Sequence, residues 1–242
     1  MISRHVPPVI YLPEEALEEC RAYLESHLAF RLHGQEIEEM LPSYRLVGVR
    51  GGQKVRLTGK GHTDKLCEIF QCHHSVPCVG YGFLQEKKRL KAEYAGVPGR
   101  QLGALRKQGV ALDEPFESPM FLFMGDTTVQ FFEEQLELEG KGKENVFRYP
   151  LIITECTFLG LDEEDTNRAA RKKHIVWTEL KPIVVSHPHI VFVLIHFSLR
   201  HSPKELRSFF KDQKLDNIVV FVEEENSTLV QSHEQDQNLE DY

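Results

Sequence analysis

The chain has no long hydrophobic run and no cysteine framework. Its longest apolar stretches, Met120–Met124 and Ile190–Ile195, are far shorter than the roughly 18 residues that a membrane span needs. The five cysteines are odd in number, have no regular spacing and follow no leader-like segment. These absences exclude a membrane-spanning protein and a disulfide-stabilised secreted domain. They predict an intracellular, cytoplasmic protein in a reducing compartment.

Repeats and low-complexity segments are also absent. The 16 glycines and 12 prolines are scattered, and no heptad persists over several turns. Collagen-like, mucin-like, coiled-coil and solenoid proteins are therefore excluded. What remains is a chain of 242 residues with 41% hydrophobic residues, which is enough for one large globular domain or two small ones.

Positive charge is scarce overall but clustered. The formal net charge is −8, yet residues 223–242 hold seven acidic residues and no lysine or arginine, which leaves 29 basic and 30 acidic residues in 1–222. We expect residues 1–222 to form the folded domain and residues 223–242 an acidic disordered tail. The basic residues gather at 87–91, 100–107 and 168–173. Such clusters are typical of RNA-binding surfaces and also of solvated helix faces.

Short apolar runs alternate with helical patterns, which predicts an α/β fold. We expect strands at Val9–Leu12, Tyr44–Val49, Lys54–Thr58, Leu66–Gln71, Cys78–Leu84, Met120–Met124, Leu151–Thr154, Ile190–Ile195 and Asn217–Val222. We expect helices from Pro13, in the basic stretch after Leu84, and at Thr128–Leu138, His174–Val185 and Pro203–Phe210, with Ser202 as the N-cap of the last.

Each of the three strongest strands is followed by an ionisable residue, which suggests a shared site at one sheet edge. Asp126, Glu155 and His196 are these residues. Asp126 suits either a helix N-cap or a metal-binding carboxylate, with Gly125 allowing close approach of the backbone to a metal. His196 suits a metal ligand or a core histidine. Glu155 would be costly to bury alone, so we expect His174 as its partner, in a proton relay or a structural ion pair.

Zinc prefers histidine, aspartate and cysteine ligands, and the histidines and aspartates of this chain suit it better than its cysteines. Neighbouring residues on an extended chain point in opposite directions, so only one of the adjacent pair His73 and His74 faces a site, and we expect His74. Cys72 and Cys78 are interpreted as small core residues. The His187-Pro188-His189 segment has no carboxylate after it and is interpreted as a turn.

Six segments in this order resemble the metallo-β-lactamase superfamily, and within it the short-form ribonuclease Z group of tRNA 3′-processing endonucleases. The segments are His74–Gly82, Leu90–Gly96, Leu105–Val110, Gly125–Thr128, Glu155–Leu159 with the later His174, and Ile195–Arg200. The resemblance implies an αβ/βα sandwich with two zinc ions, a precursor tRNA or other RNA substrate, and a homodimer.

The resemblance also implies residue roles. His74 and His196 each bind one zinc ion, Asp126 bridges both, and Glu155 with His174 forms the proton relay. Ser198 and Arg200 touch the scissile phosphate, although His201 stands where the family has tyrosine. The Leu90–Val110 segment lies beside the mouth of the site, where its basic residues contact tRNA.

The family's leading His-x-His-x-Asp-His signature, with its further zinc ligands, has no counterpart in this sequence. We therefore expect an N-terminally incomplete fold with an exposed sheet edge. Each zinc ion would have two protein ligands where catalytic zinc usually has about three, so we expect weak or absent zinc binding in this chain alone. Two alternatives stay open: a related hydrolase of small substrates, or a non-catalytic truncated form.

Overall fold

The computed structural model describes residues 7–32, 44–57 and 64–222. The predicted tail, the residues around Gly59–Gly61 and the end of the strand predicted to reach Thr58 lie outside these ranges. Within them, no helix has both the length and the apolar character that crossing a bilayer requires.

The first strands form a small parallel sheet of their own. β1 (Val9–Pro13) is followed by η1 (Glu14–Ala16) and α1 (Leu17–Leu32), and it pairs with β2 (Arg45–Val49). In the described part of the chain β1 has β2 as its one strand partner, and Ile10 is exposed. The predicted strand and helix at this end are therefore confirmed, and no second strand among the described residues pairs with β1.

A seven-stranded mixed sheet forms the body of the chain, with strand order β3-β4-β5-β6-β7-β8-β9. Its strands are β3 (Lys54–Arg56), β4 (Lys65–Gln71), β5 (Val79–Leu90), β6 (Asp113–Phe123), β7 (Leu151–Glu155), β8 (Val191–Ile195) and β9 (Ile218–Val220). β3 to β6 pair antiparallel, and β6 to β9 pair parallel. The predicted α/β class is confirmed by this sheet and its helices.

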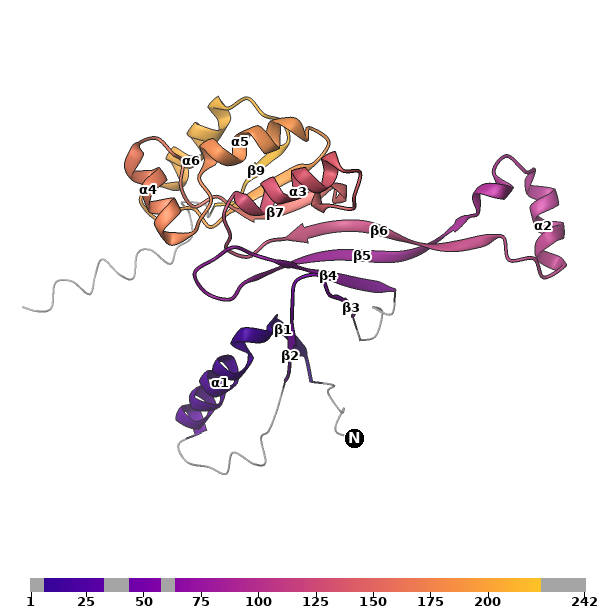
Figure 1. The fold of residues 1–242 in the computed structure, drawn as a ribbon, viewed down its shortest axis with the longest axis horizontal. Coiled ribbons are helices and arrows are strands. Elements are labelled where there is room, and N and C mark those ends of the chain that lie inside the picture. The colour runs from indigo at the N-terminus through magenta and orange to yellow at the C-terminus, as the bar shows by residue number, and fades with distance from the viewer. Residues whose placement is uncertain (1–6, 33–43, 58–63, 223–242) are drawn as a thin grey trace, which may run out of the picture.

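Four α-helices lie against the parallel half of the sheet, whereas β1, β2 and α1 lie on the opposite side of β4–β6 (Figure 1). These helices are α3 (Gln130–Gly140), α4 (Glu163–Lys172), α5 (Trp177–Ser186) and α6 (Pro203–Asp212), and η4 (Val146–Arg148) precedes β7. The main core lies between these helices and the sheet, and it includes the fully buried Ile152, Trp177 and Phe192. Ser202 caps α6 in a capping box, as predicted.

The basic stretch after Leu84 contains a correction. Lys87, Lys88 and Arg89 were expected in a helix, but they continue β5 to Leu90. A continuous antiparallel ladder with β6 holds them, and the Arg89 side chain forms an ion pair with Glu114 across the two strands. Partners 25 residues away in the chain thus override the local helix preference of the lysines.

The connection between β5 and β6 does contain a helix. It comprises η3 (Ala92–Tyr94) and α2 (Gly99–Lys107), and α2 has no buried residue. The far halves of β5 and β6 carry α2 well away from the rest of the chain (Figure 1). We call residues 86–117 the arm. It comprises the far half of β5, the connection that contains α2, and the first part of β6.

The position of His174 is a second correction. It was expected to open a helix, but it lies between α4 and α5. Lys173 ends α4 with a left-handed backbone (φ 55°), and a bridge between Phe158 and Val176 holds the following residues extended. α4 itself was not predicted, although Asp162 is its N-cap and three acidic residues fill its first turn.

Candidate metal and proton-transfer site

The three residues predicted to share a site come together at one edge of the sheet. β6, β7 and β8 are parallel neighbours, so their carboxyl ends lie side by side. Asp126 follows β6, Glu155 ends β7 and His196 follows β8. His74 reaches the same place from the β4–β5 connection, and His174 reaches it from the α4–α5 connection.

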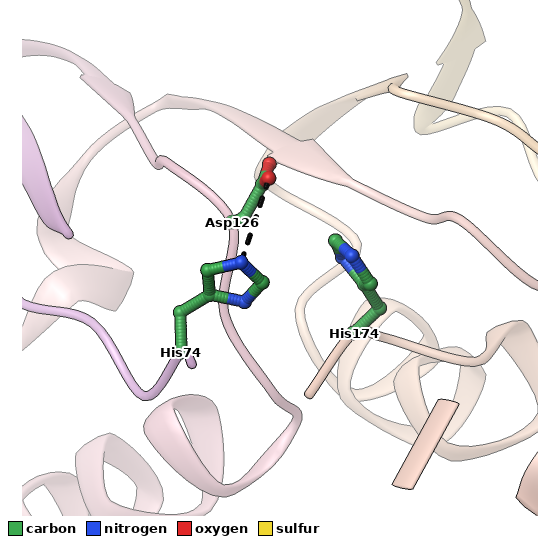
Figure 2. Close-up of side chains that lie close together, drawn as sticks. All are labelled: His74, Asp126 and His174. Carbon is green, nitrogen blue, oxygen red and sulfur yellow. Dashed lines mark ion pairs between the residues drawn. The ribbon is translucent and has the colours of Figure 1, made fainter. Parts of the chain in front are cut away.

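Asp126 lies between two histidines. Its Oδ2 is 3.9 Å from Nε2 of His74, and its Oδ1 is 3.8 Å from Nδ1 of His196. Both separations are longer than a hydrogen bond. Figure 2 shows His74 and His174 on the two sides of Asp126. Oδ2 of Asp126 therefore faces the ring of His74 and Oδ1 faces the ring of His196, an arrangement typical of a carboxylate that bridges two metal ions.

The His74 ring is oriented by the backbone. Its Nδ1 is 2.9 Å from the carbonyl oxygen of Lys173, and because a carbonyl can only accept, Nδ1 carries the proton. Nε2 of neutral His74 is then a lone-pair acceptor that faces the Asp126 carboxylate. Two acceptors that face each other suit a cation between them. Two ligand atoms of one tetrahedral zinc ion lie about 3.3 Å apart, against 3.9 Å between Nε2 of His74 and Oδ2 of Asp126. The donor chemistry at His74 and Asp126 thus fits a metal ion.

Glu155 is almost completely buried, with 1% of its surface exposed. Oε1 accepts hydrogen bonds from the backbone N–H of Thr127 at 2.9 Å and from Nδ1 of His174 at 2.8 Å. Oε2 accepts from the hydroxyl of Thr157 at 2.6 Å and from the backbone N–H of Ile175 at 3.2 Å. Four donors compensate the cost of burying this charge. The expected partnership of Glu155 with His174 is present.

His174 has a raised pKa. The hydrogen bond that its Nδ1 donates to Glu155 is the main cause, and partial burial opposes it by lowering the pKa. The His174 ring lies 4.9 Å from the ring of His74 and 5.3 Å from that of His196, centroid to centroid. A protonated His174 is therefore stabilised next to the residues that face Asp126.

Two groups of side chains have the spacing of a metal site. One contains His74, Asp126 and His174, and the other contains Glu155, His174 and His196. Within each group the ligand atoms lie within 4.8 Å of one another. Both groups include His174, whose Nδ1 already binds Glu155, so only its Nε2 is available to a metal ion or a substrate.

His73 and the two neighbouring cysteines have other partners. His73 turns away to Glu134, with its Nε2 3.0 Å from that carboxylate. Cys72 is buried and Cys78 half-buried. A hydrogen bond from the Cys72 thiol lowers the pKa of Cys78.

A Cβ atom at Gly125 would collide with the sulfur of Cys78, so glycine is needed there for packing against a thiol. The expected role of Gly125 beside a metal is unsupported by this contact.

His187 lies buried at the other end of β8. Its Nδ1 lies 2.8 Å from the carbonyl oxygen of Ile183, and its Nε2 lies 3.3 Å from Glu139. The ring stacks on Phe147, with centroids 3.8 Å apart. These contacts give His187 a packing role in the turn before β8.

Ser198 and Arg200, predicted to touch phosphate, line a hollow of about 410 Å³ beside the histidines. Its walls include Thr157, Phe158, Arg168, Lys172, His174, His196, Phe197, Ser198, Leu199 and Arg200. Arg200 donates to the buried carboxylate of Asp165 at 2.7 Å, which ties the segment after β8 to α4. The hydroxyl of Ser198 accepts a long hydrogen bond from the backbone N–H of Arg200.

Sequence reasoning missed Thr127 and Thr157, which hydrogen-bond to Glu155, and Asp165, which anchors Arg200. Arg168 and Lys172 in the hollow were noted only as part of a basic cluster. A threonine directly after Asp126 and another two residues after Glu155 are weak signals, since threonine is common in both turns and strands.

Comparison with known proteins gives sequence relatives that share one activity name, while no family model matches. The chain is 29% identical over 205 residues to the chloroplastic tRNase Z TRZ2 of Arabidopsis thaliana, and 26% identical over 200 residues to tRNase Z TRZ1 of the same plant. Each match covers 83% of this chain. The chain is tRNase Z-like in sequence. The resemblance inferred from its motifs is thereby confirmed.

The chain spans 52% of the length of TRZ2 and 65% of the length of TRZ1. Among solved structures, the metallo-β-lactamase fold protein YhfI of Bacillus subtilis is similar, with a TM-score of 0.48 and 12% sequence identity. The match covers 92% of this chain and 65% of the YhfI chain. The human short form of tRNase Z is also similar, with a TM-score of 0.44 and 14% sequence identity. That match covers 91% of this chain and 67% of the human chain.

Proposed function

We propose that the chain carries part of the site of a zinc-dependent endoribonuclease that removes the 3′ trailer of precursor tRNA. The observation that carries this proposal is the position of Asp126 between His74 and His196, beside the buried Glu155–His174 pair. Sequence similarity to tRNase Z over 83% of the chain supports the choice of RNA as substrate.

His74, Asp126 and His196 would hold the metal, with Asp126 shared between two ions. Metal ions held by these residues would supply hydroxide at neutral pH and would stabilise the negative charge on a phosphodiester. His74 and His196 offer one imidazole nitrogen each, so each ion would have two ligands from these residues. We infer weak zinc binding by this set, below the affinity of a site with three or more protein ligands.

Glu155 and His174 would handle the proton of the leaving group. Glu155 accepts from Nδ1 of His174 and so directs Nε2 of that ring toward Asp126 and the hollow. The raised pKa keeps His174 protonated to higher pH, which suits a general acid that gives a proton to a leaving 3′-oxygen. Glu155, saturated with donors, orients the ring and stabilises its charge.

The RNA would lie across the hollow and the arm. Ser198 and Arg200, which line the hollow, would contact the scissile phosphate. The basic residues of the arm would contact phosphates farther along: Lys87, Lys88, Arg89, Lys91, Arg100, Arg106 and Lys107. Residues 1–222 act as one domain with an acidic tail, in a homodimer. The protein works inside the cell, in the cytoplasm or in an organelle.

Cleavage of precursor tRNA tests the activity. We expect a zinc-dependent cut at the 3′ trailer, and we expect little hydrolysis of bis(p-nitrophenyl)phosphate. The reverse pattern would favour a related hydrolase of small substrates. No metal-dependent cleavage of either compound, by the chain or by a version extended upstream, would favour a non-catalytic form.

Two variants separate the metal-binding and relay roles. We expect Asp126→Ala to abolish metal-dependent cleavage and to lower the zinc content measured by elemental analysis, whereas Asp216→Ala, at an exposed aspartate away from the site, changes neither. We expect His174→Ala to slow cleavage about 100-fold or more while zinc content stays at the wild-type value. His189→Ala is its control. Equal loss of zinc in Asp126→Ala and His174→Ala would contradict the assigned roles.

A further inference from the structure

Thr157 connects the two halves of the site. Its side chain is buried, and its single hydroxyl lies 2.6 Å from Oε2 of Glu155 and 2.9 Å from Nδ1 of His196. Glu155 belongs to the relay pair, and His196 belongs to the set that faces Asp126. One side chain therefore contacts both groups at once.

The direction of both hydrogen bonds follows from counting protons. The three other partners of Glu155 are donors: two backbone N–H groups and Nδ1 of His174. The carboxylate accepts from all of them, so it also accepts from Thr157. A hydroxyl has one proton, which it gives to Glu155, and its oxygen can then only accept from Nδ1 of His196. His196 consequently carries its proton on Nδ1.

We propose that Thr157 is a positioning residue that holds His196 as the Nδ1-protonated tautomer and leaves Nε2 as its metal-binding atom. The proposal rests on the zinc site proposed above and adds which atom binds. Zinc-binding histidines commonly donate their second ring N–H to a fixed acceptor, which orients the ring. His74 has such an acceptor in the carbonyl of Lys173, and Thr157 is the equivalent for His196.

His196 needs such support more than His74 does. About half of its side chain is exposed, against 10% for His74, and its backbone has a left-handed φ of 58°. A half-exposed ring has few packing contacts to fix its rotamer. Nδ1 is also the ring nitrogen nearest to Asp126, at 3.8 Å, so metal binding at Nδ1 is the competing assignment. The hydrogen bond to Thr157 decides between the two.

NMR of the ring nitrogens tests the tautomer directly and needs no metal. The full chain is labelled with ¹⁵N-histidine, and the spectrum is recorded with EDTA at about pH 8.5, where an ordinary histidine with a pKa of about 6.5 is neutral. The signals of His196 are those lost in His196→Asn. We expect Nδ1 to be protonated in the wild type and in Thr157→Ser, and Nε2 to be protonated in most molecules of Thr157→Val. Protonation at Nε2 in the wild type would overturn the proposal.

Zinc titration adds a second measurement. Thr157→Val should weaken zinc binding about 10- to 100-fold in competition with a chromophoric chelator, and Thr157→Ser should bind as the wild type does. The matched control is Thr128→Val, because the hydroxyl of Thr128 is buried without a hydrogen-bond partner among the described residues. Zinc that shifts Nδ1 of His196 rather than Nε2 would overturn the proposal. A wild-type chain that binds no zinc would count against the zinc site, while the tautomer would still be decided by the metal-free spectra.

Discussion

The edge of the sheet at β6–β8 and the arm hold charged residues in opposite ways. At the edge, Glu155 is buried and accepts four hydrogen bonds from groups on three segments of the chain. In the arm, Arg89 pairs with Glu114 and Arg106 pairs with Asp113, and both arginine side chains are more than half exposed. The first set is fixed by its surroundings, whereas the second remains in contact with water.

In the function that we propose, this difference separates chemistry from substrate capture. A proton relay needs fixed donors and acceptors, and burial supplies them at the cost of requiring every partner. A surface that tracks a flexible RNA backbone needs charges that can exchange one partner for another, and exposed ion pairs allow this at little cost in stability. The edge should therefore be sensitive to single substitutions that the arm tolerates.

The largest effect is expected at the centre of the buried set. Glu155→Gln keeps the size of the side chain but replaces one acceptor oxygen with an NH₂ donor that faces existing donors. We expect the free energy of unfolding to fall by about 3 kcal/mol, measured by urea denaturation, because buried groups lose their partners. Glu164→Gln, at an exposed residue of α4, should change it by less than about 0.5 kcal/mol. Equal effects of the two variants would show that Glu155 is less constrained than its contacts imply.

The buried strands of this edge were predictable, but the arm was not. Leu151–Thr154 and Ile190–Ile195 are short apolar runs that favour a largely buried strand, and β7 and β8 fall there. Lys87–Arg89 carries a local pattern that suits a helix as well as a strand. Its strand conformation depends on residues 114–116, which pair with it across a connection of more than 20 residues.

The site divides in the same way. Asp126, Glu155 and His196 could be predicted because each follows a recognisable strand, and parallel strands align their ends. Thr157 and Asp165 could not, since their roles depend on hydrogen bonds to His196 and Arg200, 39 and 35 residues away. Residues that act through others carry little local signal.

A smaller effect at the edge depends on pH. Folding raises the pKa of His174 through Glu155, so the protonated ring stabilises the folded state. This contribution is complete below the unfolded pKa of about 6.5 and is lost as the pH rises through the higher folded value. The stability difference between the wild type and His174→Asn, measured by urea denaturation with EDTA, should therefore be larger at pH 5.5 than at pH 9. In a Glu155→Gln background this pH dependence should shrink, and its persistence would assign it to another group.

The smallest effect on stability is expected in the arm. There the two partners of one ion pair should change RNA binding in opposite directions. Arg89→Ala and Glu114→Ala each remove the same exposed pair, so each should lower the free energy of unfolding by about 1 kcal/mol or less. Their effects on RNA should differ in direction. Loss of Arg89 should weaken precursor tRNA binding and reduce the salt dependence by about one phosphate contact, whereas loss of Glu114 frees Arg89 and should strengthen binding. Filter binding between 50 and 200 mM salt measures both. If both variants weaken binding equally, the arm acts through its shape, and the contrast with the buried edge would then rest on stability alone.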